Sequence, residues 1–512
     1  MNVLLILADQ FRSDCLRHLG NEVIQTPNLD RLASEGVSFT HCFNQTAPCG
    51  PSRMCIYTSR YLCSTRVVHN GTPLMDAEDN LAFFLKEAGY DPGLIGYNSY
   101  TIDPAHLPEG DIRRSSLDYH NSLPGFDWVL NHEKDSDEYF QWLGDGKGYP
   151  PELLNREAIH EPAVPEEGPG EHLPQHFPAR YRKEHSECRY VTDRAIDYVR
   201  ERKPASPADK GWVLSLNYNK PHPPNICCEP YCDMYDPADM PPAARSEEEL
   251  TPTHPYLRGL AHQALTDELH LQEYRACYYG MITEVDDNLG LLFEALEESG
   301  QWDDTLIIFS SDHGEHLGDH YIMSKGQFHD GGMRIPYIIK DPSPEADATR
   351  GQIMPHFIES IDSAPTLMEA LGEPIPERFQ GRSLLGLLRD DRDYKALEEI
   401  HYEFDYRGRR WAGENPDPDV HVLWVVRDRE FKYVYFADEE MPPILFDLTS
   451  DPDELTNVAG RPEYAAAELH YSHKLLRWRM KNEDQRMERW AQPLRGYSQS
   501  AHRPDRYASQ IQ

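Results

Sequence analysis

The sequence predicts an α/β fold, in which a large, mixed, mostly parallel sheet is sandwiched between helices and a smaller antiparallel sheet follows near the C-terminus. Two apolar runs, Val3 to Ala8 and Thr305 to Phe309, are typical of strands that are covered on both faces. Helical patterns lie between these runs, as in other α/β proteins. Over residues 420–448, β-rich segments alternate with turns, which predicts the second sheet.

Polar pairs follow both predicted strands. Asp9 and Gln10 come directly after the first strand, and Asp312 and His313 follow the second within four residues. Ligands of open α/β sheets bind beyond the carboxyl ends of the strands, so we expect the two pairs to share a site. Between the strands, residues 26–36 predict a short capped helix, and residues 273–300 predict a longer helix that Gly300 closes.

Two segments lack a clear periodicity. Residues 103–180 and 236–256 are rich in proline and acidic side chains, and we expect the first to be an excursion over the sheet edge that forms a pocket wall or an oligomer contact. A change of character near Pro374 predicts a catalytic domain over residues 1–374 and a C-terminal α+β subdomain over 375–512. The polar last 30 residues suggest an arm that reaches a neighbouring subunit.

Composition excludes several classes of protein. The net charge of −37 over 512 residues makes nucleic acid and anionic membranes poor partners, and no apolar run approaches the length of a membrane span. The short N-terminal apolar run has no basic flank, so we expect a strand rather than a signal peptide, and a cytoplasmic protein with reduced thiols. Three cysteines in "ICCEPYC" (Cys227, Cys228, Cys232) are expected to be ordinary thiols, with a zinc site as the alternative.

Cys49 lies in the stretch "TAPCGPSRMCIYTSR". Pro51 is well tolerated in the first turn of a helix, which places Cys49 just outside a helix N-terminus, where free N–H groups favour an anion. Taken alone, a lone cysteine is more often a buried core thiol than a nucleophile. A thiolate nucleophile and a precursor of a modified residue are the alternatives.

The residues around Cys49 instead favour a functional role for it over that of a core thiol. Cys49, Pro51, Ser52 and Arg53, followed by Thr58 and Arg60, match the CxPSR signature, and the chain resembles the sulfatases of the alkaline phosphatase superfamily. "NKPHPPN" (219–225), "SDHGEHLGDH" (311–320) and "LFDLTSDPDELTNVAG" (445–460) look like further landmarks of that family in the expected order. The resemblance implies an alkaline phosphatase-like fold, a formylglycine-generating enzyme as a partner that oxidises Cys49 to formylglycine, and a homo-oligomer, either a dimer or a tetramer.

The resemblance also implies a mechanism and a metal site. Hydrated formylglycine carries two hydroxyl groups, so that one can attack the substrate and the second can expel the product anion and regenerate the aldehyde. Asp9, Gln10, Asp312, His313 and the modified Cys49 would hold one divalent metal ion, and Asp312 would also assist deprotonation of the nucleophile. Gln10 and His313 depart from the usual calcium-binding set, and the nitrogen of His313 favours Mn²⁺, with Zn²⁺, Fe²⁺ and Ca²⁺ as alternatives.

Three further residues are expected to be catalytic. Arg53, one helical turn after Cys49, would hydrogen-bond the modified side chain, and Lys325 matches the family lysine that contacts the anionic group or the leaving oxygen. Each alone would more often be a solvated charge. His222 is expected to protonate the leaving group, because the unperturbed pKa of histidine suits a general acid near neutrality. A structural role remains the alternative for this histidine.

One comparison indicates the substrate. Typical sulfatases carry GKWH where this chain has "LIGYNSYTIDP", so Tyr97 and Ser99 replace two potential cations with neutral hydroxyls. With Asn70 as a third binding residue, the pattern is similar to phosphonate monoester hydrolases and favours phosphonate monoesters or phosphodiesters, which carry one negative charge. A sulfate monoester also carries one charge, so arylsulfatase activity is an alternative. A two-metal phosphatase or mutase and an inactive binding module are the others.

Overall fold

A computed structural model describes residues 1–111, 121–132, 137–202, 210–261, 264–407 and 417–482 of the 512-residue chain. Its centre is a nine-stranded sheet in the order β4-β3-β5-β1-β6-β8-β2-β7, with β9 paired to β2. The strands are β1 (Asn2–Ala8), β2 (Val37–Phe43), β3 (Pro92–Gly96), β4 (Asp127–Asn131), β5 (Val213–Tyr218), β6 (Thr305–Ser310), β7 (Arg334–Ile335), β8 (Tyr337–Lys340) and β9 (Gln352–Glu359).

The sheet is mixed, and its central part is parallel as predicted. Strands β4, β3, β5, β1 and β6 pair in parallel, whereas β8 is antiparallel to both β6 and β2. In register, Leu7 of β1 lies opposite Asn217 of β5 and Ser310 of β6. The segments that follow these three parallel strands therefore begin side by side at the same edge of the sheet.

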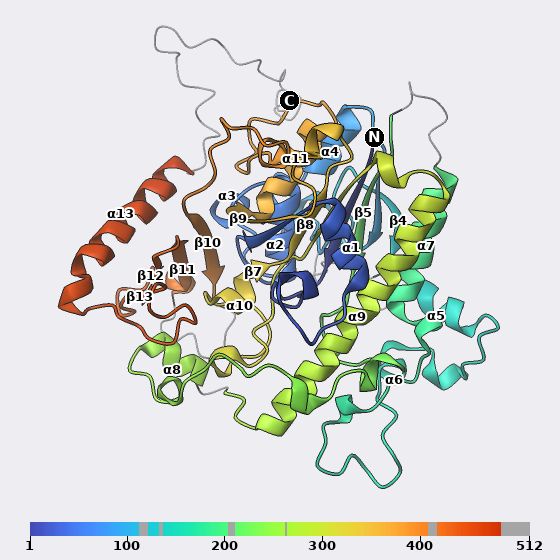
Figure 1. The fold of residues 1–512 in the computed structure, drawn as a ribbon, viewed down its shortest axis with the longest axis horizontal. Coiled ribbons are helices and arrows are strands. Elements are labelled where there is room, and N and C mark those ends of the chain that lie inside the picture. Colours follow the sequence, from blue (N-terminus) through green and yellow to red (C-terminus); the bar gives the residue numbers. More distant parts are fainter. Residues whose placement is uncertain (112–120, 133–136, 203–209, 262–263, 408–416, 483–512) are drawn as a thin grey trace.

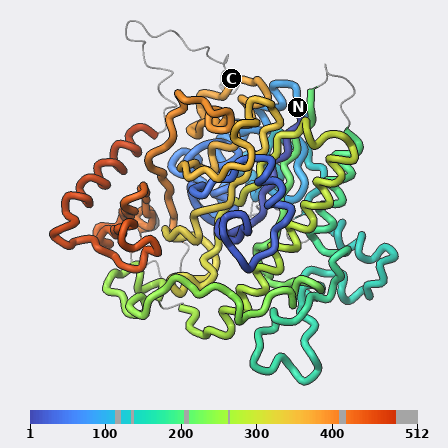
Figure 2. Tube along the Cα trace, in the orientation of Figure 1, coloured from blue at the N-terminus to red at the C-terminus, as the bar shows by residue number. Residues whose placement is uncertain are grey.

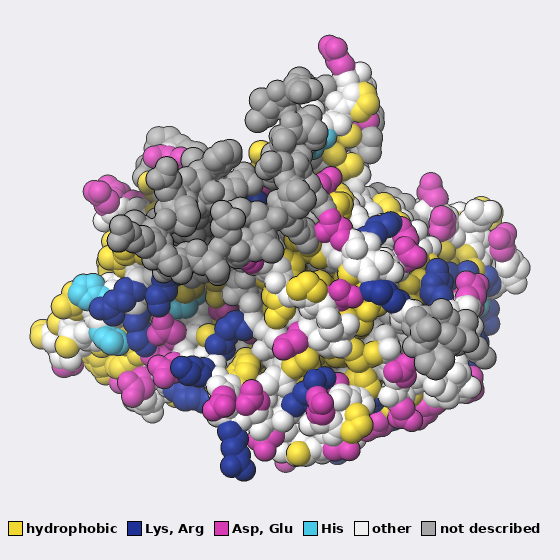
Figure 3. Space-filling model, turned by 90° about the horizontal axis from the view of Figure 1, so that it is seen from above, with side chains coloured by type: hydrophobic (Ala, Val, Ile, Leu, Met, Phe, Trp, Pro, Cys, Tyr) yellow, Lys and Arg dark blue, Asp and Glu magenta, His cyan; other side chains and the backbone are white. Residues whose placement is uncertain are grey.

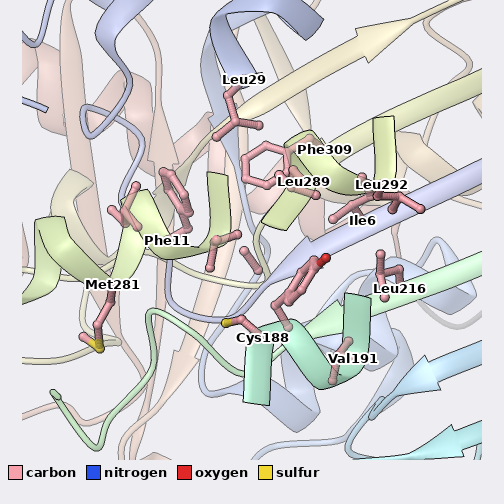
Figure 4. Packing of buried hydrophobic residues seen from close by; sticks show 14 of the residues in the cluster. Ile6, Phe11, Leu29, Cys188, Val191, Leu216, Met281, Leu289, Leu292 and Phe309 are labelled. Atoms are coloured by element: carbon pink, nitrogen blue, oxygen red, sulfur yellow. The ribbon is translucent and has the colours of Figure 1, made fainter. Parts of the chain in front are cut away.

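Both faces of the sheet are covered by helices (Figure 1). Along β1, alternate side chains point to opposite sides: Leu4 and Ile6 pack towards α1 (Pro27–Glu35), α7 (Glu187–Glu201) and α9 (Glu268–Glu298). On the other side, Leu5 packs with residues of α2 (Cys49–Thr58), α4 (Leu81–Glu87) and α11 (Ser363–Ala370). Figure 4 shows the first of these layers, where Ile6 and Phe309 lie among side chains of α1, α7 and α9. The continuous apolar runs in the sequence reflect this burial on both faces.

Two predicted helices differ from the structure at their N-termini. Helix α9 begins at Glu268 rather than Glu273, because the Asp267 side chain caps it by accepting a hydrogen bond from His270 N–H. Helix α1 begins at Pro27, but the Thr26 hydroxyl makes no capping bond. It accepts instead from Arg17 N–H and donates to the Asp30 carboxylate, so the expected side-chain cap was wrong.

The predicted small antiparallel sheet is present near the C-terminus. It contains β10 (Ile400–Asp405), β11 (Val422–Arg427), β12 (Phe431–Phe436) and β13 (Ile444–Asp447), and α13 (Ala465–Lys481) packs against it. Figure 2 shows this red part of the chain at one end of the molecule and residues 137–180 at the opposite end. The domain boundary near residue 374 stays a prediction, and the expected C-terminal arm lies outside the described residues.

The excursion over residues 103–180 contains more structure than predicted. Its residues Asp127–Asn131 form β4, an edge strand parallel to β3, and two short helices follow, α5 (Asp137–Gly144) and α6 (Arg156–Ile159). Arg156 and His160 from this segment line the cavity that contains Cys49, so the expectation of a pocket wall is confirmed. The 236–256 segment forms short 3-10 turns and leads into α8 (Pro255–Ala261).

Charged side chains and free thiols are distributed over the described residues as follows. On the face seen in Figure 3, acidic and basic side chains are interspersed among the described residues. All ten cysteines are free thiols, and Cys227 lies 3.6 Å from Cys277 between the sulfur atoms without a bond. Within the described ranges, none of the helices has both the length and the apolar character that crossing a membrane requires.

Candidate active site

The predicted site residues converge beyond the carboxyl ends of four neighbouring strands. Asp9 and Gln10 follow β1, Asp312 and His313 follow β6, His222 follows β5, and Tyr97 and Ser99 follow β3. In the sheet these strands lie side by side in the order β3-β5-β1-β6. The parallel register therefore brings together residues that are far apart in the sequence, such as Gln10 and Asp312, which are 302 positions apart.

Cys49 is the first residue of α2, and the chain reaches it from β2 through a short buried loop. The helix starts one residue earlier than predicted, because Ser52 N–H already bonds to the Pro48 carbonyl. Pro51 still lies in the first turn, where a missing N–H costs no hydrogen bond. Burial and the nearby Asp9 carboxylate raise the pKa of the Cys49 thiol well above its usual range. In the absence of a metal ion, this shift disfavours the thiolate, which is the reactive form of cysteine.

The side chains of Asp9, Cys49, Asp312 and His313 form a buried group that could hold a metal ion. Their potential ligand atoms all lie within 4.8 Å of one another. His313 Nε2 is 3.4 Å from Cys49 Sγ, 3.7 Å from Asp9 Oδ1 and 3.8 Å from Asp312 Oδ1. These spacings are those of a loosely arranged ligand set, which suits a divalent cation with oxygen and nitrogen ligands.

The protonation of His313 also suits metal binding. Its Nδ1 lies 3.1 Å from the Gly314 carbonyl oxygen, which can only accept, so Nδ1 carries the proton and Nε2 keeps its lone pair. Burial lowers the pKa of His313 to about 4, so the ring is neutral near pH 7. Burial alone would raise the pKa of Asp9, but His222, Lys325 and His313 together lower it below its usual range. The site therefore offers an ionised carboxylate beside a neutral imidazole.

Gln10 contributes an amide oxygen to the same region. Its Nε2 donates to Glu315, and its backbone N–H donates to Asp312 Oδ1 at 3.1 Å. The Oε1 atom is buried and has no hydrogen-bond partner among the described residues. Because a buried unpaired carbonyl oxygen is costly, a cation is a reasonable partner for it.

Arg53 connects the helix to the strand ends. Fully buried, it donates from Nε to Asp312 Oδ2 at 2.8 Å and from Nη2 to Asp9 Oδ2 at 3.3 Å. A further bond from Nη1 reaches Asn217 Oδ1 at 2.7 Å, and the guanidinium lies 4.1 Å from the centre of the Tyr97 ring. Although burial opposes the charge, Asp312 and Asp9 raise the pKa of Arg53 above its usual range. The arginine fixes both metal-site carboxylates.

Lys325 contacts Cys49 directly, and His222 lines the cavity that contains Cys49. Lys325 Nζ is 3.2 Å from Cys49 Sγ, and although burial opposes its charge, Cys49, Asp9 and Asp312 raise its pKa, so it is a cation. His222 Nδ1 donates to the Pro223 carbonyl oxygen at 2.7 Å, which leaves Nε2 as the atom that can deliver or accept a second proton. Burial lowers the pKa of His222.

The expected substrate-binding residues line a cavity of about 260 Å³ together with Cys49 and His222. Asn70 Oδ1 accepts a hydrogen bond from Gly50 N–H at 2.8 Å, so its amide hydrogens remain available to a ligand oxygen. Ser99 has a positive φ of 54°, and its buried hydroxyl has no partner among the described residues. Tyr97 packs its ring on Arg53. The structure thus brings all the predicted residues together, while their individual roles remain predictions.

Some functional positions were not predicted. Asn217 holds Arg53 from within β5, and as a polar residue in the otherwise apolar run "WVLSLNY" it could have been noticed. Glu315 orients Gln10 and belongs to the quoted "SDHGE" segment. Lys220, which belongs to the quoted "NKPHPPN" segment, also lines the cavity, as do Arg156 and His160, whose local sequence gives no such indication.

Comparison with known proteins agrees with this geometry. The family profile described as "Sulfatase" matches residues 1–373, and one described as "N-sulphoglucosamine sulphohydrolase, C-terminal" matches residues 318–481. The multifunctional alkaline phosphatase superfamily protein PehA of Trinickia caryophylli is 38% identical over 528 positions, covering 98% of this chain and 99% of that protein. An arylsulfatase of Clostridium perfringens is 29% identical, with 93% of each protein covered.

Solved structures give the same grouping. The phosphonate monoester hydrolase of Agrobacterium radiobacter superposes with a TM-score of 0.86 at 36% identity, covering 95% of this chain and 97% of that one. The phosphonate monoester hydrolase from Silicibacter pomeroyi gives a TM-score of 0.84 at 32% identity, covering 95% and 96%. These similarities extend over nearly the whole length of each protein.

Proposed function

This chain belongs to the sulfatase family of the alkaline phosphatase superfamily and is a hydrolase, and from that premise we propose that it hydrolyses phosphonate monoesters and phosphodiesters. Sulfate monoesters would be additional substrates. The reaction would depend on formylglycine at position 49 and on one divalent metal ion. The similarity to two phosphonate monoester hydrolases supports the choice of substrate.

The position of Cys49 is the main support for this proposal. Its sulfur lies 3.2 Å from the Lys325 ammonium group and 3.4 Å from His313 Nε2, at the N-terminus of a helix. A side chain there meets a cation on one side and a group of metal-binding residues on the other. A thiol or thiolate has no second hydroxyl group with which to expel the product, whereas a hydrated formylglycine would supply a hydroxyl nucleophile that can be regenerated.

The residues present fit a divalent metal. Asp9, Asp312, His313, the unpaired Gln10 oxygen and position 49 would hold it, and the imidazole nitrogen favours Mn²⁺, with Zn²⁺, Fe²⁺ and Ca²⁺ as alternatives. When bound, the ion would supply positive charge that favours an ionised hydroxyl and offsets the charge of the reacting group. Arg53 would keep the two carboxylates in place for it.

The chain's other residues would handle the substrate. Lys325 would neutralise the anionic oxygen or the leaving oxygen, and His222 Nε2 would donate a proton to the leaving group. The Asn70 amide and the Ser99 hydroxyl would donate hydrogen bonds to the oxygens of the bound centre. Because Ser99 is a neutral hydroxyl, it adds no positive charge to the binding site. The site would therefore suit a phosphorus or sulfur centre that carries one negative charge.

The excursion would select the leaving group. Two other side chains that line the cavity already have partners. Lys220, from the loop after β5, is paired with Glu284 and its Nζ lies 3.0 Å from the Tyr181 hydroxyl, and His160 Nε2 lies 3.3 Å from Glu187. The half-buried Arg156 guanidinium has no ion pair or hydrogen bond among the described residues. We therefore expect leaving groups that carry a carboxylate or a phosphate to bind better than neutral ones.

Two measurements test the proposal. Peptide mass spectrometry of active enzyme from its native host should show formylglycine at position 49, and an unmodified cysteine in fully active enzyme would exclude the mechanism. Metal-loaded enzyme of verified modification should then be compared on aryl phosphonate, phosphodiester and sulfate esters. A kcat/KM that is highest for the sulfate ester would instead favour arylsulfatase activity, which the similarity to the C. perfringens arylsulfatase also supports.

The same measurements separate the two remaining alternatives. A two-metal phosphatase or mutase should hold two tightly bound ions per chain, which metal analysis would detect. An inactive binding module should hydrolyse none of the esters, and its ligand binding should survive Cys49→Ala.

A further inference from the structure

A second group of potential metal ligands lies outside the active-site cavity, at the junction of the excursion with α9. It consists of His172, His176 and Glu273, whose ligand atoms all lie within 4.8 Å of one another. Helix α9, the long helix labelled in Figure 1, packs against the 3-10 turn Pro174–His176. From these residues we propose a second, regulatory or structural site for Zn²⁺.

The local sequence sets the two histidines side by side. In "HLPQH" they are four residues apart, and the turn that begins at Pro174 brings their rings into a stack with centroids 4.4 Å apart and planes 12° from parallel. Both Nδ1 atoms face the same carboxylate oxygen. His172 Nδ1 is hydrogen-bonded to Glu273 Oε1, and His176 Nδ1 lies 3.8 Å from it.

Glu273 is an unusual partner for two surface histidines. Its side chain is 1% exposed, whereas those of His172 and His176 are 47% and 36% exposed. Within the described ranges no lysine or arginine pairs with it, and its other bond is to Leu173 N–H, 2.8 Å from Oε2. A buried carboxylate is stabilised by a positive charge that it contacts directly. A divalent cation between the three groups would supply such a charge.

The chemistry of the three ligands selects the ion. Two imidazole nitrogens and one carboxylate oxygen are a set that zinc commonly takes, and magnesium and calcium prefer oxygen alone. In a tetrahedral zinc site the ligand atoms are about 3.3 Å apart. His176 Nδ1 would therefore need to approach Glu273 by roughly half an ångström, and His172, which is hydrogen-bonded to Glu273, would need to move away from it. Since both histidines are exposed, the fourth position faces solvent and would be filled by water.

The site would fasten the excursion to the body of the protein. Residues His172 and His176 lie just after the segment that contributes Arg156 and His160 to the wall of the cavity, and Glu273 belongs to the helix that packs on the central sheet. Zinc binding would therefore restrict the segment between residues 161 and 171. This role does not depend on which ester the enzyme hydrolyses.

The test is a zinc count on the full chain. An Asp312→Asn background weakens the proposed catalytic metal site, and its metal-free form is loaded with Zn²⁺, desalted and analysed by mass spectrometry for zinc per chain. We expect about one zinc per chain, and its loss when His172→Ala and His176→Ala are added. His106→Ala, an exposed histidine of the same excursion, serves as the control and should retain the ion.

A second variant guards against a folding defect. Glu273→Gln keeps an acceptor for Leu173 N–H but removes the charge, so it should fold and yet lose the zinc. Zinc should also slow proteolysis between residues 161 and 171 in the background protein and not in the double histidine variant. An equal zinc count in the background, the double variant and the control, with equal proteolysis rates, would overturn the proposal.

Discussion

The Arg53 guanidinium and the Asp312 carboxylate form a fully buried pair, with Nε 2.8 Å from Oδ2, and this pair joins the helix that carries Cys49 to the end of β6. The same guanidinium reaches Asp9 at the end of β1. One side chain therefore fixes the helix that carries Cys49 against both strands that would hold the metal.

Replacement of Arg53 should affect activity and stability together. Arg53→Ala leaves two buried carboxylates without their cation, so we expect a loss of about 3–5 kcal/mol in the free energy of unfolding. We also expect kcat/KM to fall by roughly a hundredfold or more, because the ligand carboxylates lose their orientation. Arg31→Ala is the control, since Arg31 pairs with Glu297 at the surface and should change neither quantity by much. Thermal unfolding and steady-state kinetics check both, and full activity in Arg53→Ala would contradict the assignment.

Ser99→Ala separates a substrate contact from a structural one. The Ser99 hydroxyl is buried without a partner among the described residues, so its removal should leave the melting temperature unchanged. If it donates to the bound ester, kcat/KM should fall by about tenfold, as for one hydrogen bond to a charged group. Thr101→Val is a matched control, because the Thr101 hydroxyl is likewise buried and unpaired but lies outside the residues that line the cavity. An equal loss in both variants would count against the role of Ser99.

The roles of His222 and Lys325 predict a dependence on the leaving group. His222→Asn and Lys325→Ala should lower kcat by about 10² to 10⁴ for esters with alkoxide leaving groups, which need a proton or a cation. The loss should be much smaller for a nitrophenolate, which leaves without either. The measurement is the slope of log kcat against the pKa of the leaving group. If both variants keep the wild-type slope, the two residues do not assist departure.

Arg156 predicts a preference on the leaving-group side. For two aryl phosphonate esters that differ only in a carboxylate or a carboxamide on the ring, Arg156→Ala should raise KM about fivefold to tenfold for the first and leave the second unchanged. Arg180→Ala is the control, because this arginine of the same excursion pairs with Glu161. A uniform rise in KM for both esters would show that Arg156 acts on the fold and not on the charge.

The Glu359 carboxyl predicts a pH dependence of stability. Burial, followed by the charge of the neighbouring Asp362, raises the pKa of Glu359 to about 8 from its ordinary value near 4.5. The folded protein therefore keeps a proton that the unfolded chain releases, so the stabilisation is complete below about pH 4.5 and is lost as the pH rises through 8. Through this group, the free energy of unfolding falls by at most about 1.4 kcal/mol per pH unit.

Glu359→Gln should remove the contribution of Glu359 to this pH dependence. The glutamine keeps an acceptor for the Tyr61 hydroxyl, which donates to Glu359 Oε2 at 2.6 Å. The measurement is the urea midpoint between pH 5 and pH 9. Glu345→Gln, at an exposed position, should retain the wild-type slope. A flat wild-type profile would contradict the prediction.

Much of the fold could be predicted from local pattern. The runs that became β1 and β6 are mostly apolar because helices cover both faces of the sheet, and Asp9 and Asp312 stand out where those runs end. The cysteine motif and the histidine loop were identified from their resemblance to the sulfatase family, which was possible because each motif is contiguous in the sequence. These features need no knowledge of distant contacts.

Other features depend on contacts that the sequence does not display. Strand β4 buries only Leu130, so it lacks the apolar pattern of a central strand and was assigned to the excursion. Arg156 reaches the cavity because the chain returns to the strand ends after a long detour. The Thr26 hydroxyl bonds to Arg17 and Asp30 rather than to its own helix, a tertiary preference that propensity rules cannot anticipate.

The division of the site among neighbouring strands has an evolutionary consequence. The carboxylates and the imidazole come from the ends of β1 and β6, whereas Tyr97 and Ser99 follow β3 and Arg156 comes from the excursion. Mutations after β3 or in the excursion could therefore change which ester is accepted, while the carboxylates and the imidazole at the ends of β1 and β6 stay the same. A descendant could pass through generalist intermediates without losing its chemistry, and relatives with different preferences are the expected outcome of such a history.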